Sequence, residues 1–296
     1  MDRKNIQAFF KAAFAVVVWG ASFIATKVAL RDVSPVTVVW LRFTLGVVIL
    51  GIAVASRKQF ALPGGKDLAY FALLGFLGIT FHQWLQSNGL VTAQATSTAW
   101  IVATTPIFIA ILGWLILKEK LRWLQALGIV LAFVGVLLVV TNGNLASLVT
   151  GHFGEPGDLL IMISAPNWAI FSILSRYGLR RHPAALMILY VMGLGWVFTS
   201  ILFFSGPGVA QVSQLTLKGW LGVVFLGVFC SGLAYIFWYD ALQALPASQV
   251  GVFLYIEPLV TVMVAAAVLG EPLLLASLLG GAIILFGVWL VNRSAK

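Results

Sequence analysis

The chain has 296 residues, of which 61% are hydrophobic and only 9% are charged. Soluble domains carry about 25% charged residues, so this composition excludes a water-soluble globule, and its hydrophobicity excludes a disordered chain. The net charge of +9 comes from small basic clusters between long apolar runs, which argues against a nucleic-acid partner and for the lipid bilayer. A single cysteine, Cys230, excludes an intramolecular disulfide. We expect neither a metal site nor a cofactor.

Apolar runs separated by Pro, Gly and charged residues predict ten membrane-spanning helices, because a bilayer core needs about 20 apolar residues per helix. The first run follows a basic N-terminus but has no convincing cleavage site, so we interpret it as an uncleaved helix rather than a signal peptide. The predicted all-α membrane protein has spans at 9–30, 35–55, 67–90, 94–117, 122–141, 157–178, 184–204, 217–240, 246–269 and 272–291.

The basic residues predict the orientation of these helices. With the N-terminus in the cytoplasm, fourteen Lys and Arg fall in inside segments, whereas only Arg31 and Lys218 fall outside. Such a bias favours a cytoplasmic location of both termini. Lys27 and Arg42 remain within the predicted spans. For Lys27 we expect snorkelling to the outer headgroups; Arg42 lies deeper, where freed carbonyls or a substrate carboxylate are possible partners.

An internal repeat divides the chain. An offset of 152 residues places Pro106 on Pro258, Glu119 on Glu271, Gly128 on Gly280 and Gly135 on Gly287, and an offset of 149 places Trp19 on Trp168. Each unit contains five predicted spans, so the second unit runs inverted relative to the first. We predict a first repeat at 1–141, a connecting loop at 142–156 and a second repeat at 157–296. Inverted repeats are typical of secondary transporters.

These residues also carry a family resemblance. The pair Trp19-Gly20 with Lys27, and the twice-written Pro, Glu, Gly and Gly element, resemble the drug/metabolite transporter superfamily and its EamA-type ten-helix members. Within the superfamily the pattern is most similar to the bacterial aromatic amino-acid exporter branch. The resemblance covers nearly the whole chain. It implies a 5+5 inverted bundle in the bacterial inner membrane that moves small organic metabolites, usually outward.

A transporter site is expected near the membrane midplane, where helices are interrupted. Proline removes a backbone donor and frees the carbonyl four residues earlier, so we expect helix breaks or gating positions at Gly20, Pro106, Pro166 and Pro258. A packing kink is the alternative for each proline. Polar and aromatic residues at depth are the candidate substrate-binding residues, namely Trp19, His82, Gln86, Trp100, Asn167, Trp168, Tyr235, Tyr255 and Glu257.

Glu257 is the most informative candidate, since it is the carboxylate placed at mid-membrane. It aligns with Thr105 in the first repeat, so the repeated scaffold does not require it. A lone glutamate there can stay protonated, pair with a cation, accept a substrate ammonium or form a structural hydrogen bond. For His82 and the tryptophans, helix packing is the alternative to a binding role. The repeated glycines present small faces on helices 5 and 10, for packing between the halves or between protomers; we expect a monomer, with a dimer through these faces as the alternative.

The function that these observations favour is export of a small-molecule substrate by alternating access. Small amphipathic metabolites, and in particular aromatic amino acids, are the expected cargo at the midplane cavity. The alternatives are a multidrug or cationic-compound exporter of the same fold and a channel-like facilitator. An intramembrane enzyme is not expected, because paired aspartates, a Ser/His constellation and an H-E-x-x-H helix are missing from the sequence.

Overall fold

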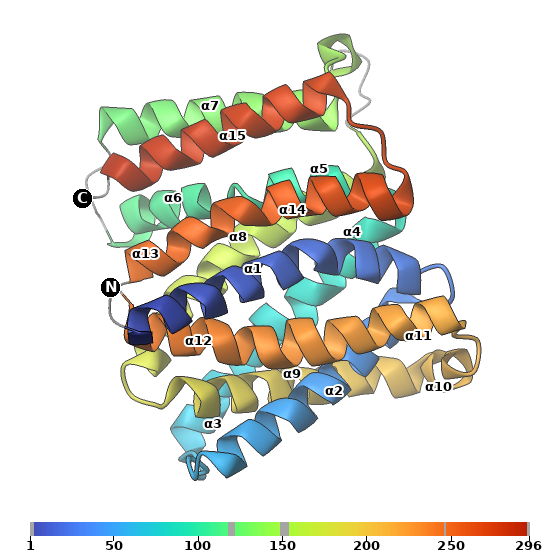
Figure 1. Ribbon diagram of the computed structural model, residues 1–296, viewed down its shortest axis with the longest axis vertical. Coiled ribbons are helices and arrows are strands. Elements are labelled where there is room, and N and C mark those ends of the chain that lie inside the picture. The colour runs from blue at the N-terminus through green and yellow to red at the C-terminus, as the bar shows by residue number, and fades with distance from the viewer. Residues whose placement is uncertain (1–2, 118–121, 149–153, 246, 295–296) are drawn as a thin grey trace.

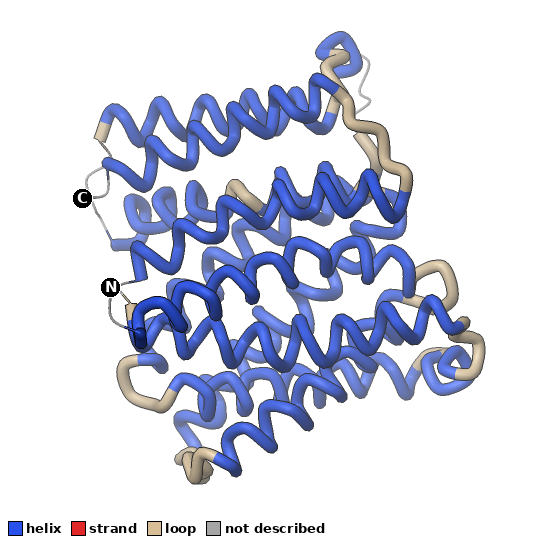
Figure 2. The backbone as a smooth tube through the Cα atoms, in the orientation of Figure 1, coloured by secondary structure: helices blue, strands red, loops and turns tan. Residues whose placement is uncertain are grey.

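The computed structural model describes residues 3–117, 122–148, 154–245 and 247–294. Ten helical segments in these ranges are long and apolar enough to cross a membrane, which confirms the predicted count. The chain is a multi-pass membrane protein, and its helices lie side by side in one bundle (Figures 1 and 2). The elements of the ten segments, in chain order, are α1 (Arg3–Ala29); α2 (Pro35–Ser56); α3 (Gly65–Gly75), η1 (Phe76–Phe81) and α4 (His82–Thr92); α5 (Ala95–Val102) and α6 (Thr105–Leu117); α7 (Trp123–Val140); α8 (Pro156–Leu179); α9 (Ala184–Ser205); α11 (Leu217–Val224), η3 (Phe225–Leu233) and α12 (Ala234–Ala244); α13 (Ala247–Val252), η4 (Phe253–Ile256), α14 (Glu257–Val264) and η5 (Ala265–Leu269); and α15 (Leu275–Ser294).

Local sequence signals explain several helix ends. Pro35 and Pro156 occupy the first positions of α2 and α8, where a missing amide donor costs nothing. Gly270 follows η5 with a φ of 68°, a left-handed conformation that glycine adopts without strain. Two short helices lie in the connections, η2 (Leu145–Leu148) and α10 (Gly208–Val212).

The two halves of the chain run in opposite directions through the bundle. In Figure 1, α1 leads away from the end that holds both termini, whereas α8, its counterpart in the second half, leads back toward it. We call that end of the bundle the termini end and the other the far end. The helices pair across the halves, α1 with α12, α4 with α8, α2 with α9 and α7 with α15. These pairings interleave the halves in one core.

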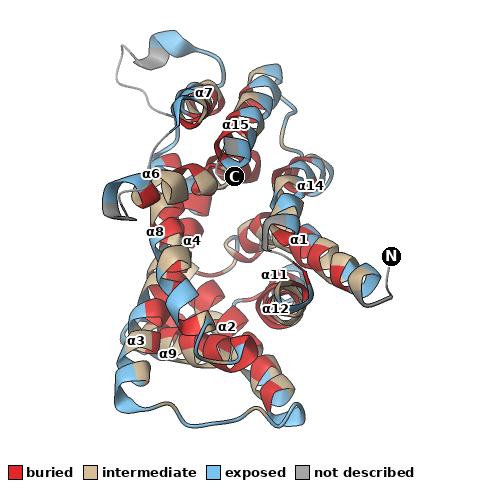
Figure 3. Ribbon diagram, turned by 90° about the vertical axis from the view of Figure 1, so that its left-hand side faces the viewer, coloured by how far each residue is buried: buried red, intermediate tan, exposed pale blue. Residues whose placement is uncertain are grey.

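The repeated glycines pack against one another within the chain. A Cβ atom built on Gly128 would lie 2.5 Å from the carbonyl oxygen of Gly287, and one on Gly135 would lie 2.6 Å from that of Gly280. The faces predicted for α7 and α15 are therefore buried between the two halves. Buried residues gather on the helix faces turned into the bundle (Figure 3), while large apolar side chains such as Phe133 and Ile52 are exposed on its outside, as expected of a lipid-facing surface. Glu119, the predicted repeat partner of Glu271, lies outside the described residues.

Several spans depart from α-helical geometry at positions that correspond between the halves. The π-helix η1 in the third span corresponds to the π-helix η3 in the eighth, and the turn at Ala103–Thr104 corresponds to the end of the 3-10 helix η4. The turn and η4 end two residues before Pro106 and Pro258, respectively. Both prolines therefore mark interrupted helices.

Two expected helix breaks do not occur. The helix α1 continues through Gly20, and α8 continues through Pro166. At Gly20 the missing side chain serves close approach instead, since a Cβ atom would lie 2.7 Å from the carbonyl oxygen of Glu257. Pro166 removes one intrahelical hydrogen bond, and the remaining bonds of a 24-residue helix keep α8 continuous.

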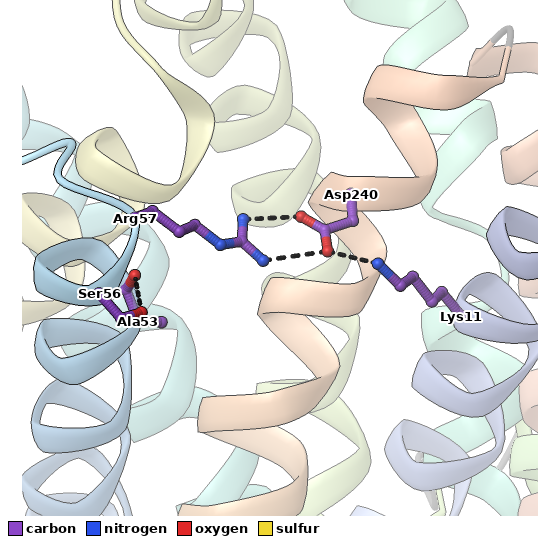
Figure 4. A network of polar contacts seen from close by, with 5 residues as sticks. All are labelled: Lys11, Ala53, Ser56, Arg57 and Asp240. Carbon is purple, nitrogen blue, oxygen red and sulfur yellow. Dashed lines mark hydrogen bonds and ion pairs between the residues drawn. The ribbon is translucent and has the colours of Figure 1, made fainter. Parts of the chain in front are cut away.

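Asp240 connects three helices near the termini end. Its carboxylate accepts two hydrogen bonds from the Arg57 guanidinium, at 2.8 and 3.1 Å, and lies 2.7 Å from Lys11 Nζ (Figure 4). The bidentate geometry is the strong form of such a pair. The ends of α1 and α2 are thereby fixed to α12.

Candidate functional site

A cavity of about 110 Å³ lies inside the bundle and is lined by both halves of the chain. We call it the central cavity. Six of the predicted substrate-binding residues reach it, which places residues from distant parts of the sequence around one space. Its lining consists of Trp19, Ser22, Phe23, Arg42, His82, Gln83, Gln86, Val102, Trp168, Tyr235, Leu254 and Glu257.

A second cavity of about 170 Å³ adjoins the first, and we call it the termini-side cavity. Glu257 and Trp168 line both cavities, together with Val102 and Leu254, the residues whose carbonyls the prolines were expected to free. Pro106 and Pro258 also line it, and Gly251 of α13 and Asn292 of α15 extend it toward the termini end. The interrupted helices thus form the boundary between the two cavities.

Aromatic rings form two groups around the central cavity. Trp19 of α1 meets Tyr235 of α12 edge to face, with ring centroids 5.6 Å apart, and the His82 ring lies 4.6 Å from Trp168. The Trp19 indole donates a hydrogen bond of 3.1 Å to the carbonyl of Cys230, which lies in the π-helix η3. The π-helix therefore supplies the acceptor that orients one of the rings.

Two charged residues of opposite sign line the same cavity. Arg42 of α2 is buried, and it donates from Nε to Ser231 and from Nη1 to Gln83, each at 3.1 Å. The Glu257 carboxylate forms no hydrogen bond or ion pair with any residue in the described ranges. Since an ionised group at membrane depth is costly unless it is paired, both residues are poised to interact with a ligand.

The comparison with Thr105 separates Glu257 from the scaffold. Thr105 occupies the corresponding position in the first half, and its hydroxyl donates to the carbonyl of Val102 at 2.7 Å. In the second half a carboxylate replaces that hydroxyl and lines both cavities, whereas Thr105 lines the termini-side cavity alone. The backbone at this position accepts a small hydroxyl residue, so the glutamate is not a structural requirement of the interrupted helix.

The remaining predicted residues lie elsewhere in the bundle. Tyr255 lines the termini-side cavity, where its hydroxyl accepts a hydrogen bond from Asn292 at 2.7 Å. Asn167 donates to the carbonyl of Leu77 in the π-helix η1 at 2.9 Å, an arrangement that satisfies an irregular helix. Trp100 is 2% exposed and packs against Gly281, away from both cavities.

The set of predicted substrate-binding residues omitted part of the cavity wall. Gln83 and Arg42 contact each other there, and Ser22 and Phe23 extend the wall along α1. The polar residues of the third predicted span indicated Gln83, and the position of Arg42 deep within the second span indicated the arginine. Phe23 carries no such signal, because an apolar residue in a membrane helix looks the same whether it faces lipid, core or cavity.

The arrangement is suited to binding rather than to covalent chemistry. One cation, one carboxylate, two amide side chains and several aromatic rings line a space within the membrane-spanning part of the chain. Small-molecule sites of this kind combine an apolar wall with a few polar groups that fix orientation. Sites between interrupted helices of inverted repeats are typical of secondary transporters.

Comparison with known proteins agrees with this interpretation. Curated relatives include an uncharacterized transporter of Archaeoglobus fulgidus, 27% identical over 97% of this chain and 98% of its own, and the uncharacterized transporter YyaM of Bacillus subtilis, 30% identical over 91% and 88%. A probable terminal-alkyne amino-acid exporter of Streptantibioticus cattleyicolor is 27% identical over 98% and 95%. A crystal structure with 19% sequence identity superposes with a TM-score of 0.66 over 98% of both chains, which shows the shared fold. The sequence model of the EamA-like transporter family matches residues 7–141 and again 155–293, so the chain is a transporter rather than an enzyme and belongs to that family.

Proposed function

We propose that this protein exports small amphipathic metabolites, with aromatic amino acids as the cargo, by alternating access around the central cavity. The observation that carries the proposal is the composition of the cavity wall. Trp19, Trp168 and Tyr235 offer faces for an aromatic ring, and Glu257 offers a carboxylate for an ammonium group. The related amino-acid exporter from Streptantibioticus cattleyicolor supports the same class of cargo.

We further propose that the termini end faces the cytoplasm of a bacterial cell, across its inner membrane. In Figure 1 that end holds the beginnings of α1 and α3 and the ends of α2, α8 and α15. These helix ends and the residues that directly follow them carry five of the described basic residues, Lys11, Arg57, Lys66, Arg180 and Arg293. The positive-inside rule assigns such an end to the cytoplasm. The termini-side cavity then forms an entrance for cytoplasmic cargo, which is consistent with export.

A cationic-compound exporter is the second candidate, and the same carboxylate favours it. Glu257 shares its cavity with two tryptophans, and aromatic faces attract cations. The two candidates differ in what they expect of a carboxylate on the cargo: an amino-acid exporter requires it, whereas a cation exporter is indifferent to it or excludes it.

The experiment that tests the proposal is counterflow in proteoliposomes. Vesicles preloaded with unlabelled L-phenylalanine should accumulate labelled L-phenylalanine, and a carrier should show this exchange acceleration whereas a channel should not. Exchange that is stimulated instead by tetraphenylphosphonium, with no response to amino acids, supports the cation exporter. Running the assay at two pH gradients, with the wild type and Glu257→Gln, tests whether this residue couples transport to protons.

A further inference from the structure

We infer that Arg42 is a specificity-determining residue that binds the carboxylate of the cargo, so that the central cavity selects zwitterions with their carboxylate on Arg42 and their ammonium on Glu257. The inference rests on the proposed function and adds that Arg42 recognises the carboxylate of the cargo.

The first argument is the incomplete pairing of Arg42. A guanidinium has five N–H donors, and Ser231 and Gln83 accept one hydrogen bond each, from Nε and Nη1. Both acceptors are neutral, so they orient the side chain without neutralising its charge. A carboxylate accepts two parallel hydrogen bonds from a guanidinium. The guanidinium of Arg42 therefore keeps unused N–H donors at the cavity wall, and these match a carboxylate best.

The second argument is that Arg42 departs from the internal repeat. The helices α2 and α9 have the same length, and the offset of 149 residues that relates their ends places Arg42 on Val191. Val191 is fully buried in an apolar cluster and has 0% exposure. The repeated scaffold thus accommodates an apolar side chain at this position. A buried cation at membrane depth is costly unless it is compensated. Its presence at this position therefore calls for a role that the scaffold does not supply.

The third argument joins Arg42 to Glu257. Glu257 also departs from the repeat, since its counterpart is Thr105, and both departures from the repeat line the central cavity. No ion pair joins the two within the described ranges. Two opposite charges that share a cavity without neutralising each other match a ligand that carries both charges. A cationic cargo would instead meet repulsion from Arg42.

The test compares three probes that differ only in their charged groups. L-Phenylalanine carries both charges, L-phenylalaninamide lacks the carboxylate, and 3-phenylpropionate lacks the ammonium. Inhibition of labelled L-phenylalanine counterflow should be weaker for each single-charge analogue by about 10- to 100-fold, the value of one charged hydrogen-bonding contact. Equal inhibition by L-phenylalanine and its amide on the wild-type protein would overturn the inference without any variant.

The variants assign the preference to the residue. Arg42→Gln should abolish the discrimination between L-phenylalanine and its amide, and Arg42→Lys should keep part of it because the charge remains but the bidentate geometry is lost. Glu257→Gln is the matched control: it should weaken recognition of the ammonium and preserve the preference for a carboxylate. An Arg42→Gln or Arg42→Lys protein that retains the full wild-type preference overturns the inference, and Arg42→Lys serves for this if Arg42→Gln does not fold.

Failure of this inference is distinguishable from failure of the proposed function. If L-phenylalanine is exchanged and Arg42 variants leave its preference over the amide intact, the exporter stands and the role of Arg42 is wrong. If L-phenylalanine is not exchanged but 3-phenylpropionate is, and Arg42→Gln abolishes that exchange, the carboxylate contact stands and the amino-acid cargo is wrong.

Discussion

Position 257 lets function be separated from folding, because its repeat counterpart shows which residue the scaffold tolerates. Glu257→Thr copies Thr105, whose hydroxyl hydrogen-bonds three residues back to Val102. We expect this variant to fold with nearly unchanged thermal stability in detergent and to lose about tenfold or more in transport rate, since it removes a contact with the cargo. Thr105→Val is the converse control: it leaves a backbone carbonyl without its partner and should cost about 1 kcal/mol of stability. Because Thr105 lines the termini-side cavity and not the central one, the preference for the cargo's ammonium should not change. Equal transport by Glu257→Thr and the wild type would contradict the proposed site.

Two tryptophans that look equivalent in the sequence should respond differently to truncation. Trp168 lines both cavities, whereas Trp100 packs against Gly281 in the core between the halves. Trp168→Ala should reduce counterflow while the melting temperature changes little, and Trp100→Ala should reduce the stability itself by about 3–5 kcal/mol through the cavity that it creates. Thermal unfolding and counterflow measured on both variants separate the two effects. The assignment is wrong if Trp168→Ala unfolds the protein and Trp100→Ala alone impairs flux.

At the scale of helices, the contact between α7 and α15 depends on glycine. Gly135→Ala places a methyl group 2.6 Å from the Gly280 carbonyl oxygen, and the obstacle is backbone rather than a flexible side chain. We expect a loss of about 1–3 kcal/mol from this overpacking, seen as a lower melting temperature. Gly51→Ala in α2 is the matched control, because nothing lies within 4 Å of its built Cβ. That variant should leave stability unchanged or raise it; a similar loss in both would show that the contact is not the cause.

The spans themselves were predictable because hydropathy and proline positions encode them. Pro106 and Pro258 marked interruptions that the structure shows at Ala103–Thr104 and Phe253–Ile256. The π-helices η1 and η3 were not predictable, since neither contains proline and since their carbonyls accept hydrogen bonds from side chains distant in the sequence, Asn167 for η1 and Trp19 for η3. The same limit applies to the site: sequence indicated polar residues at depth, but helix rotation decided that Trp100 faces the core and that Arg42 faces the cavity.

At the scale of the whole molecule, the two ends of the bundle differ in how they hold the halves together. At the far end, Glu271 of the second half accepts hydrogen bonds from the backbone amides of Ala95 and Thr96, and Lys27 of α1 donates to the carbonyl of Ala93. The turn between α4 and α5 is therefore hydrogen-bonded to Lys27 on one side and to Glu271 on the other. The termini-side cavity extends toward the other end. The far end therefore holds the contacts that have to break before the central cavity can open on that side.

Opening of the far end should require Glu271 to release α5. Glu271→Ala removes two charge-assisted hydrogen bonds that cap a helix of the other half, worth about 1.5–3 kcal/mol each. We expect the variant to shift the population toward a state open at the far end.

The measurement is the labelling rate of a cysteine that replaces the cavity residue Ser22, in a Cys230→Ser background. A membrane-impermeant maleimide is applied from the side of the membrane that the far end faces. The rate should rise by at least tenfold, which needs a population shift of only about 1.4 kcal/mol, less than the two hydrogen bonds together contribute. Glu155→Ala is the matched control, because Glu155 lies at the same end but caps its own helix, α8. A labelling rate that Glu271→Ala leaves unchanged, or that Glu155→Ala raises equally, would show that the contact between Glu271 and α5 does not hold the far end closed.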